Sequence, residues 1–255
     1  MTIEESRAAL SVNVNKVATL RNSRGGLVPS VTAAVDVVIA AGADGVTVHP
    51  RADARHITAS DVREVAALLA RANRRLEFNI EGDPRPDLIS LVMEVRPDQC
   101  TLVPVKPGEI TSQAGWNPEA PPETLAATVA ALKAAGIRVS VFVDPEEAPI
   151  RWAAATGADR VELYTEPFAR AFHAGADQGR ASFVRYASAA RLAHELGLGV
   201  NAGHDLDLEN LVLFRTLPHL AEVSIGHALI SHALFVGLDR AVRDYAAALA
   251  GSLSD

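Results

Sequence analysis

Two kinds of segment alternate along the chain. Short runs rich in β-branched residues, in which apolar and polar positions alternate, predict strands. Longer alanine-rich segments, in which apolar positions recur at helical spacing, predict helices. The predicted strands are 11–16, 45–50, 76–81, 99–104, 138–144, 160–165, 197–203 and 221–226. The predicted helices are 30–41, 60–72, 86–96, 122–135, 145–156, 181–196, 206–216 and 227–250.

Regular strand-helix alternation implies parallel strands joined by right-handed crossovers. Eight such units in 255 residues fit one closed (β/α)8 barrel, an α/β TIM barrel, better than an open doubly wound sheet. We therefore expect a single domain over residues 1–255, with the barrel at about 10–245 and extra helices in long loops. Two connections, 105–121 and 166–180, are unusually long, and we expect the first to be a lid over the active site.

Polar side chains gather at the carboxyl ends of the predicted strands, where the active sites of such barrels form. A purely structural barrel would fill its interior with branched apolar residues, and unpaired buried polar groups are costly. The inward polar positions therefore indicate a functional rim, and they are Asn13, Asn15, Glu77, Asn79, Glu162 and Asn201.

Glycine before a helix start marks two candidate anion sites, at Gly203-His204 and Gly226-His227. Glycine lets a ligand approach the backbone N–H groups, and the helix dipole favours negative charge there. Arg51 and His56 follow the second predicted strand and could clamp a phosphate.

For acid-base chemistry the best candidates are His49, Glu77 and His204, because partly desolvated imidazole and carboxyl groups can titrate near neutral pH. Glu162 could equally be a supporting residue. A metal is the rival explanation for histidines at a rim, but the spacing of a metal site is missing and we predict none. A Schiff-base lysine is conceivable only at Lys16 or Lys106.

The net charge of the chain limits the kinds of ligand that it can bind. With 31 acidic and 24 basic residues the formal net charge is −7, which argues against nucleic acid as a partner. No apolar stretch approaches the ~20 residues of a membrane span. The start of the chain is acidic and unlike an export signal, and Cys100 is the only cysteine, so we expect a cytoplasmic protein.

Several fragments together resemble the pyridoxine 5'-phosphate synthase family over about residues 10–245. The fragments are 12–14 (Val-Asn-Val), 18–25 (Ala-Thr-Leu-Arg-Asn-Ser-Arg-Gly), 42–51 (Gly-Ala-Asp-Gly-Val-Thr-Val-His-Pro-Arg), 55–57 (Arg-His-Ile), 76–77 (Leu-Glu), 200–204 (Val-Asn-Ala-Gly-His) and 225–228 (Ile-Gly-His-Ala).

The resemblance implies an octameric barrel that needs neither metal nor organic cofactor. Its reaction would join 1-deoxy-D-xylulose 5-phosphate to 3-amino-2-oxopropyl phosphate, releasing phosphate and water. His49 and Glu77 would be the bases and His204 the proton donor. The implied ligands of the amino-ketone phosphate are Asn13, Arg24, Gly226 and His227. Those of the deoxyxylulose phosphate are Arg51, His56 and Thr111, the last delivered by the 105–121 loop.

The sequence departs from the family pattern in three segments. Asn15-Lys16 replaces an Asp-His pair, Val105 replaces a glutamate, and Asp205 replaces a glycine. We count Asn15, Lys16 and Asp205 among the substrate-binding residues. These changes leave two alternatives open: a related barrel lyase or aldolase acting on another phosphorylated ketose, and a non-catalytic paralogue that binds a B6 precursor or phosphate.

Overall fold

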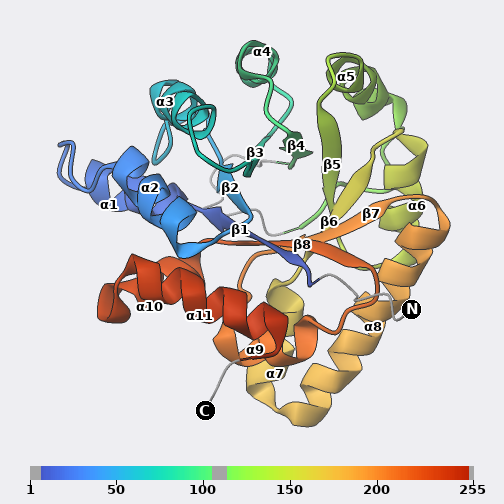
Figure 1. Ribbon diagram of the computed structural model, residues 1–255. Helices are drawn as coiled ribbons and strands as arrows, with labels where there is room; N and C mark the ends of the chain where they lie inside the picture. Colours follow the sequence, from blue (N-terminus) through green and yellow to red (C-terminus); the bar gives the residue numbers. More distant parts are fainter. Residues whose placement is uncertain (1–6, 105–113, 253–255) are drawn as a thin grey trace.

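A computed structural model describes residues 7–104 and 114–252. Within them, parallel strands pair in sequence order and the last pairs with the first, which closes the barrel (Figure 1). The strands are β1 (Ala9–Asn13), β2 (Gly45–Val48), β3 (Glu77–Gly82), β4 (Gln99–Leu102), β5 (Arg138–Val143), β6 (Arg160–Tyr164), β7 (Gly199–Gly203) and β8 (Leu220–Ile225). The (β/α)8 prediction is confirmed.

Helices surround the barrel, and Figure 1 shows them as an outer ring. They are α1 (Asn15–Asn22), α2 (Val31–Ala41), α3 (Ala59–Leu69), α4 (Pro86–Val95), α5 (Glu123–Ala134), α6 (Glu147–Ala155), α7 (Glu166–Ala174), α8 (Ala176–Glu195), α9 (Leu208–Phe214), α10 (His227–Val236) and α11 (Leu238–Ala250). In the described ranges, none of them combines the length and apolar character of a membrane span.

Local sequence explains where several helices begin. The Ser30 hydroxyl accepts a hydrogen bond from the Ala33 N–H at the start of α2. At the start of α3, Thr58 and Asp61 form a reciprocal capping box. Both arrangements satisfy amide groups that the first helical turn leaves without partners.

The predicted boundaries are wrong in three places. Residues 15–16 belong to α1 rather than to the first strand, and residues 166–180 form α7 and the beginning of α8 rather than a long loop. The single helix predicted over 227–250 is divided between α10 and α11 at Gly237, whose φ of +85° is left-handed. Gly237 adopts this conformation without the steric cost of a side chain, so the chain can turn there.

The two faces of the strands differ as their alternation requires. Outward residues such as Leu10, Val12 and Val46 are fully buried under the helices. Inward residues form polar layers, one of which links four strands through side-chain hydrogen bonds. In this layer the hydroxyls of Ser11 and Thr47 are 2.7 Å apart, Asn79 Nδ2 donates to Thr47 Oγ1 (3.4 Å), and Thr101 Oγ1 donates to Asn79 Oδ1 (3.0 Å).

A second polar layer lies toward the amino ends of the strands. Arg160 donates to Asn201 Oδ1 at 2.9 Å and lies 3.4 Å from the Glu222 carboxylate. Arg138 pairs with Glu77, and its Nε donates to Gln99 Oε1 at 2.9 Å. The interior is therefore polar along its length, and at this end its arginines lie beside its carboxyl groups.

Candidate active site

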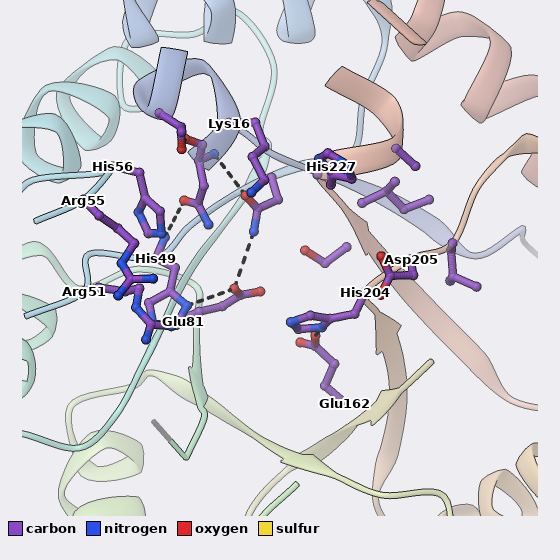
Figure 2. Close-up of a pocket in the computed structure, with 18 residues that line it drawn as sticks. Lys16, His49, Arg51, Arg55, His56, Glu81, Glu162, His204, Asp205 and His227 are labelled. Carbon is purple, nitrogen blue, oxygen red and sulfur yellow. Dashed lines mark hydrogen bonds and ion pairs between the residues drawn. The ribbon is translucent and has the colours of Figure 1, made fainter. Parts of the chain in front are cut away.

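A cavity of about 420 Å³ opens at the carboxyl ends of the strands (Figure 2). Most of the residues predicted from the sequence line it together. They are Asn13, Asn15, Lys16, His49, Arg51, His56, Glu162, His204, Asp205, Gly226 and His227. Residues from both ends of the chain thus meet at one rim, as the strand order of a closed barrel requires.

Two other predicted ligands do not join them. Arg24 is exposed in the connection between α1 and α2, outside the cavity lining. Thr111 and most of the predicted lid, 105–121, lie outside the described residues, as does Lys106. Arg24 and Thr111 therefore remain predictions from the family resemblance.

The placement predicted for Glu77 is wrong. Glu77 is the first residue of β3, at the amino end of the barrel, where it pairs with Arg138. Glu81 lies four residues further along the same strand, which is about 13 Å at the rise of a β-strand. Both side chains point inward because their positions share the same parity. Only Glu81 lines the cavity.

Glu81 faces His49 from the neighbouring strand. Their closest atoms, Glu81 Oε2 and His49 Nδ1, are 3.8 Å apart. Burial raises the pKa of Glu81 to about 8, and the charge of Glu222 contributes to the rise. Burial, followed by the charges of His56 and Arg51, lowers the pKa of His49 well below its ordinary value. The pair is thus a carboxylic acid beside a neutral imidazole at neutral pH, rather than an ion pair.

His204 and Glu162 form a second pair of the same kind. His204 Nδ1 lies 3.9 Å from Glu162 Oε1. Burial raises the pKa of Glu162 well above its ordinary value, with a further contribution from the charge of Glu81. Burial also lowers the pKa of His204, although the neighbouring Asp205 opposes that shift. The cavity therefore holds two pairs in which a neutral base lies beside a neutral acid.

Gly203 makes room for the second pair. A Cβ at this position would lie 2.5 Å from Glu162 Oε1, closer than atoms in van der Waals contact can approach. Any larger residue would displace the carboxyl group from the cavity. This close approach gives the glycine in the Asn-Ala-Gly-His motif a physical reason.

Basic side chains gather on one wall of the cavity. Figure 2 places Arg51, Arg55 and His56 on the side opposite His204, and Lys16 between His56 and His227. Burial lowers the pKa of His56 to about 4, and the charges of Arg51 and Lys16 add to this effect. The Ile57 N–H donates to His56 Nδ1 at 2.9 Å, so a neutral His56 carries its proton on Nε2 as a donor.

Asn13 and Asn15 hold the backbone of this wall. Asn15 Oδ1 accepts a hydrogen bond from the His49 N–H (2.9 Å), and Asn13 Oδ1 accepts one from the Asn15 N–H (3.0 Å). Asn13 Nδ2 also lies 3.5 Å from Glu81 Oε2. The amide of Asn15 thus uses its oxygen within the protein, and its NH₂ group is the part it can offer to a ligand.

The opposite wall contains the beginning of α10. Gly226 is its N-cap and His227 its first residue, so the first N–H groups of the helix lie at the cavity. A Cβ on Gly226 would lie 3.1 Å from Asn13 Cβ, tighter than ordinary packing. The dipole of α10 and its free amide groups favour an anion at this wall.

Sequence reasoning missed Glu81 and Arg55 as cavity residues. Glu81 had a usable signal, because it is the last inward-facing carboxyl of its predicted strand. Arg55 had none, since an arginine in a loop is most often solvated. Its guanidinium pairs with Asp53 at 2.5 Å, a contact between loop residues that only the folded chain reveals.

The structure also bears on metal and nucleophile chemistry. In residues 7–104 and 114–252, no three His, Cys, Asp or Glu side chains are grouped as a metal ion would require. Cys100 is fully buried, and burial raises the pKa of its thiol to about 12. The thiolate is therefore suppressed, which agrees with a packing role for this cysteine.

The family described as pyridoxal phosphate biosynthesis protein PdxJ matches residues 10–251. The chain is 51% identical over 238 residues to pyridoxine 5'-phosphate synthase from Christiangramia forsetii, covering 92% of this chain and 97% of the relative. It is 53% identical over 237 residues to pyridoxine 5'-phosphate synthase from Bacteroides fragilis, with the same two coverages.

Among solved structures, the chain is similar to the YdjI aldolase from Escherichia coli K12. The TM-score is 0.60, the identity 12%, and the coverage 96% of this chain and 90% of the aldolase. At this identity the likeness concerns the barrel fold alone.

We predict that Glu81→Gln changes how stability depends on pH. Folded Glu81 keeps its proton up to about pH 8, whereas an unfolded glutamate loses it near 4.5. Between these values the folded state binds the extra proton, so rising pH costs the wild type stability, by up to about 1.4 kcal/mol per pH unit. Glutamine has no such cost.

The free energy of unfolding in urea, measured at pH 5, 6.5 and 8 for both proteins, checks this. The free energy of unfolding of the variant should rise steadily relative to that of the wild type between pH 5 and pH 8. A difference that stays constant with pH would mean that Glu81 ionises at its ordinary pKa in the folded protein.

Proposed function

The chain belongs to the PdxJ family of pyridoxal phosphate biosynthesis proteins, and from that membership we propose how its cavity acts as the active site of a pyridoxine 5'-phosphate synthase. The match extends over residues 10–251, and the curated relatives share about half of its residues. The resemblance seen in the sequence is thereby confirmed. The substrates of this site are two small phosphorylated molecules, a deoxyxylulose phosphate and an amino-ketone phosphate.

The observation that carries the assignment is the occurrence of two neutral imidazole-carboxyl pairs in one cavity. His49 with Glu81, and His204 with Glu162, have closest approaches of 3.8 and 3.9 Å. Each pair can accept a proton at the imidazole and supply one from the carboxyl group without first exchanging a proton with water. Such groups are most effective when their pKa values lie near the working pH.

The condensation needs this capacity repeatedly. The amine must add to a ketone and water must leave, and then phosphate must leave and the ring must close. Each step moves protons to or from oxygen, nitrogen or carbon. We assign the proton removals to His49. The protonated Glu81 beside it, in the place first predicted for Glu77, would return a proton, and His204 would protonate the leaving oxygens. Glu162 lies beside His204 and holds a proton available to it.

Two anion sites complete the proposal. Lys16, Arg51 and the Nε2–H of His56 would bind the phosphate of the deoxyxylulose substrate. Gly226 and His227 at the start of α10, together with Asn13, would bind the phosphate of the amino-ketone. The cavity volume of about 420 Å³ suits two substrates of this size. The proposal also includes, from the family resemblance, roles for Thr111 and Arg24 and a lid at 105–121.

Of the two alternatives, the lyase or aldolase is favoured by no specific contact, because the aldolase likeness is 12% identical and concerns the fold alone. The non-catalytic paralogue is disfavoured by the imidazole-carboxyl pairs. A protein that only bound phosphate would gain nothing from burying two carboxylic acids, since burial of ionisable groups is costly. The three functions can be distinguished by incubating the protein with both phosphorylated substrates and following the product by mass spectrometry.

We predict that Glu81→Gln lowers kcat by about 100-fold or more, the usual scale for a lost acid-base group. Glu77→Gln is the matched control, because it makes the same chemical change on the same strand at the other end of the barrel. The control should stay within a few-fold of the wild type. The assignment is wrong if the two variants exchange these results, or if Glu81→Gln retains a normal kcat.

Lys16→Ala should raise the KM for the deoxyxylulose phosphate by about 10-fold while changing kcat little. The reason is that a charge-assisted hydrogen bond to phosphate contributes binding energy in every state of the reaction. Lys133→Ala is the control, since Lys133 pairs with Asp159 on the outside of the barrel. Steady-state kinetics with the amino-ketone phosphate at saturation measures KM and kcat for both variants. An unchanged KM would remove Lys16 from the binding site.

We further propose a cytoplasmic homo-oligomer, with the octamer as the family expectation. The support is an apolar patch made of Leu20, Leu27, Val28, Leu234 and Phe235. Leu27, Val28 and Phe235 are each more than 80% exposed. Leu20 lies on α1, and Leu234 and Phe235 lie on α10, which packs beside α1. Leu27 and Val28 lie in the connection that follows α1. Large apolar side chains gathered in this way mark a surface that another protein covers.

Phe235→Glu should therefore reduce the mass of the assembly measured by light scattering, because a carboxylate cannot be buried cheaply in an apolar interface. Val212→Glu serves as the control, since Val212 is also exposed, at 57%, but lies on α9. The same mass for wild type and Phe235→Glu would place any interface elsewhere.

A further inference from the structure

The loop that carries His204 has a strained backbone. His204 and Asp205 have φ angles of +76° and +57°, which side-chain-bearing residues rarely adopt. Such a residue costs conformational free energy and persists only where its surroundings hold it. Two in succession, directly at the cavity, call for contacts that hold them there.

Thr165 provides the first contact, from the end of β6. This residue is fully buried. Its backbone N–H donates to the Gly203 carbonyl at 3.2 Å. Its hydroxyl reaches both the Gly203 oxygen, at 2.5 Å, and the His204 oxygen. Because the hydroxyl has one proton and Gly203 already accepts from the amide, the side chain is available to the His204 carbonyl.

Asn210 provides the second contact, from α9. This residue is also fully buried. Its Nδ2 donates to the Asp205 carbonyl at 3.1 Å, and its Oδ1 accepts from the Asp207 N–H at 3.0 Å. The carbonyl groups of both strained residues are thus bound by buried side chains from two different elements.

The backbone conformation decides where the imidazole points. The ring of His204 lies between Phe142 and Tyr164, with centroid distances of 4.9 and 5.9 Å, and presents Nδ1 to Glu162. If His204 relaxed to negative φ, its Cα–Cβ bond would swing and the ring would leave this position. A misplacement of about 1 Å can cost 100-fold in rate.

We propose that Thr165 and Asn210 are positioning residues that hold the His204–Asp205 turn in its strained conformation and so aim the His204 imidazole at the substrate. Neither residue lines the cavity. Both act through His204. The catalytic part of this inference rests on the function proposed above, and the orientation of the ring can be measured without it.

Thr165→Val keeps the shape of the side chain and removes the hydroxyl. We expect kcat to fall by about 10-fold or more with KM changed less than about 3-fold, because the substrate contacts remain while His204 is misaligned. Thr165→Ser restores the hydroxyl and should recover most of kcat. Thr156→Val is the control, since the buried Thr156 hydroxyl likewise donates to a backbone carbonyl, that of Ala153 at 2.7 Å, outside the cavity.

An NMR titration of the His204 ring provides a readout that needs no turnover. The groups around this ring are Glu162, Asp205, the rings of Phe142 and Tyr164, and His49, whose pKa His204 influences. Burial among them lowers its pKa, so a released turn should let the pKa rise toward the ordinary value in Thr165→Val but not in Thr165→Ser or Thr156→Val.

Asn210→Asp is a second variant in case Thr165→Val does not fold. It keeps an oxygen for the Asp207 N–H and removes the donor to Asp205, and it should move the His204 titration in the same direction. Three outcomes overturn the proposal: an unmoved His204 titration in the folded variants, a kcat that Thr165→Ser fails to recover, or an equal loss in Thr156→Val. If the wild type makes no pyridoxine 5'-phosphate, the proposed function fails and the titration alone decides the positioning role.

Discussion

Inside the closed barrel, ionisable side chains face other strands rather than water, and the cost of burying their charge governs the site. Glu81 and Glu162 lie on different strands, yet burial raises the pKa of both. The same cost lowers the pKa of His49 and His204. A carboxyl group that keeps its proton beside an imidazole that lacks one is the result of one physical effect acting on two kinds of residue.

In the proposed site, this effect separates proton transfer from phosphate binding in space. The neutral pairs lie within the barrel mouth, whereas burial and the charges of Arg51 and Lys16 lower the pKa of His56 at one wall. Arginine keeps its charge even when it is buried, so it can serve the phosphate without joining the acid-base chemistry. At the opposite wall, the backbone N–H groups at the start of α10 would bind an anion without contributing a formal charge.

Carboxyl groups at the amino end of the barrel have different partners. There Glu77 has Arg138 as a direct partner, and Glu222 has Arg160. Burial raises the pKa of Glu222 as well, but these two carboxyl groups lie beside arginines, whereas Glu81 and Glu162 lie beside imidazoles and line the cavity. Two glutamates of one strand, four residues apart, thus have different roles because of what the neighbouring strands present to them.

The repeat of strands and helices, and the inward parity of Asn13, Glu77 and Glu162, were readable from the sequence because alternation is a local property. So were the glycine-helix steps at Gly203 and Gly226. The order of Glu77 and Glu81 along their strand indicated which of them lies nearer the rim, but the ion pair of Glu77 with Arg138 was not readable, because it joins residues of two separate strands. The strained His204 turn depends on backbone angles, and its contact with Thr165 joins residues 39 positions apart. Sequence alone determined which groups face inward, and tertiary structure decided which of them lie beside an arginine and which line the cavity, since burial and partners exist only once the barrel has closed.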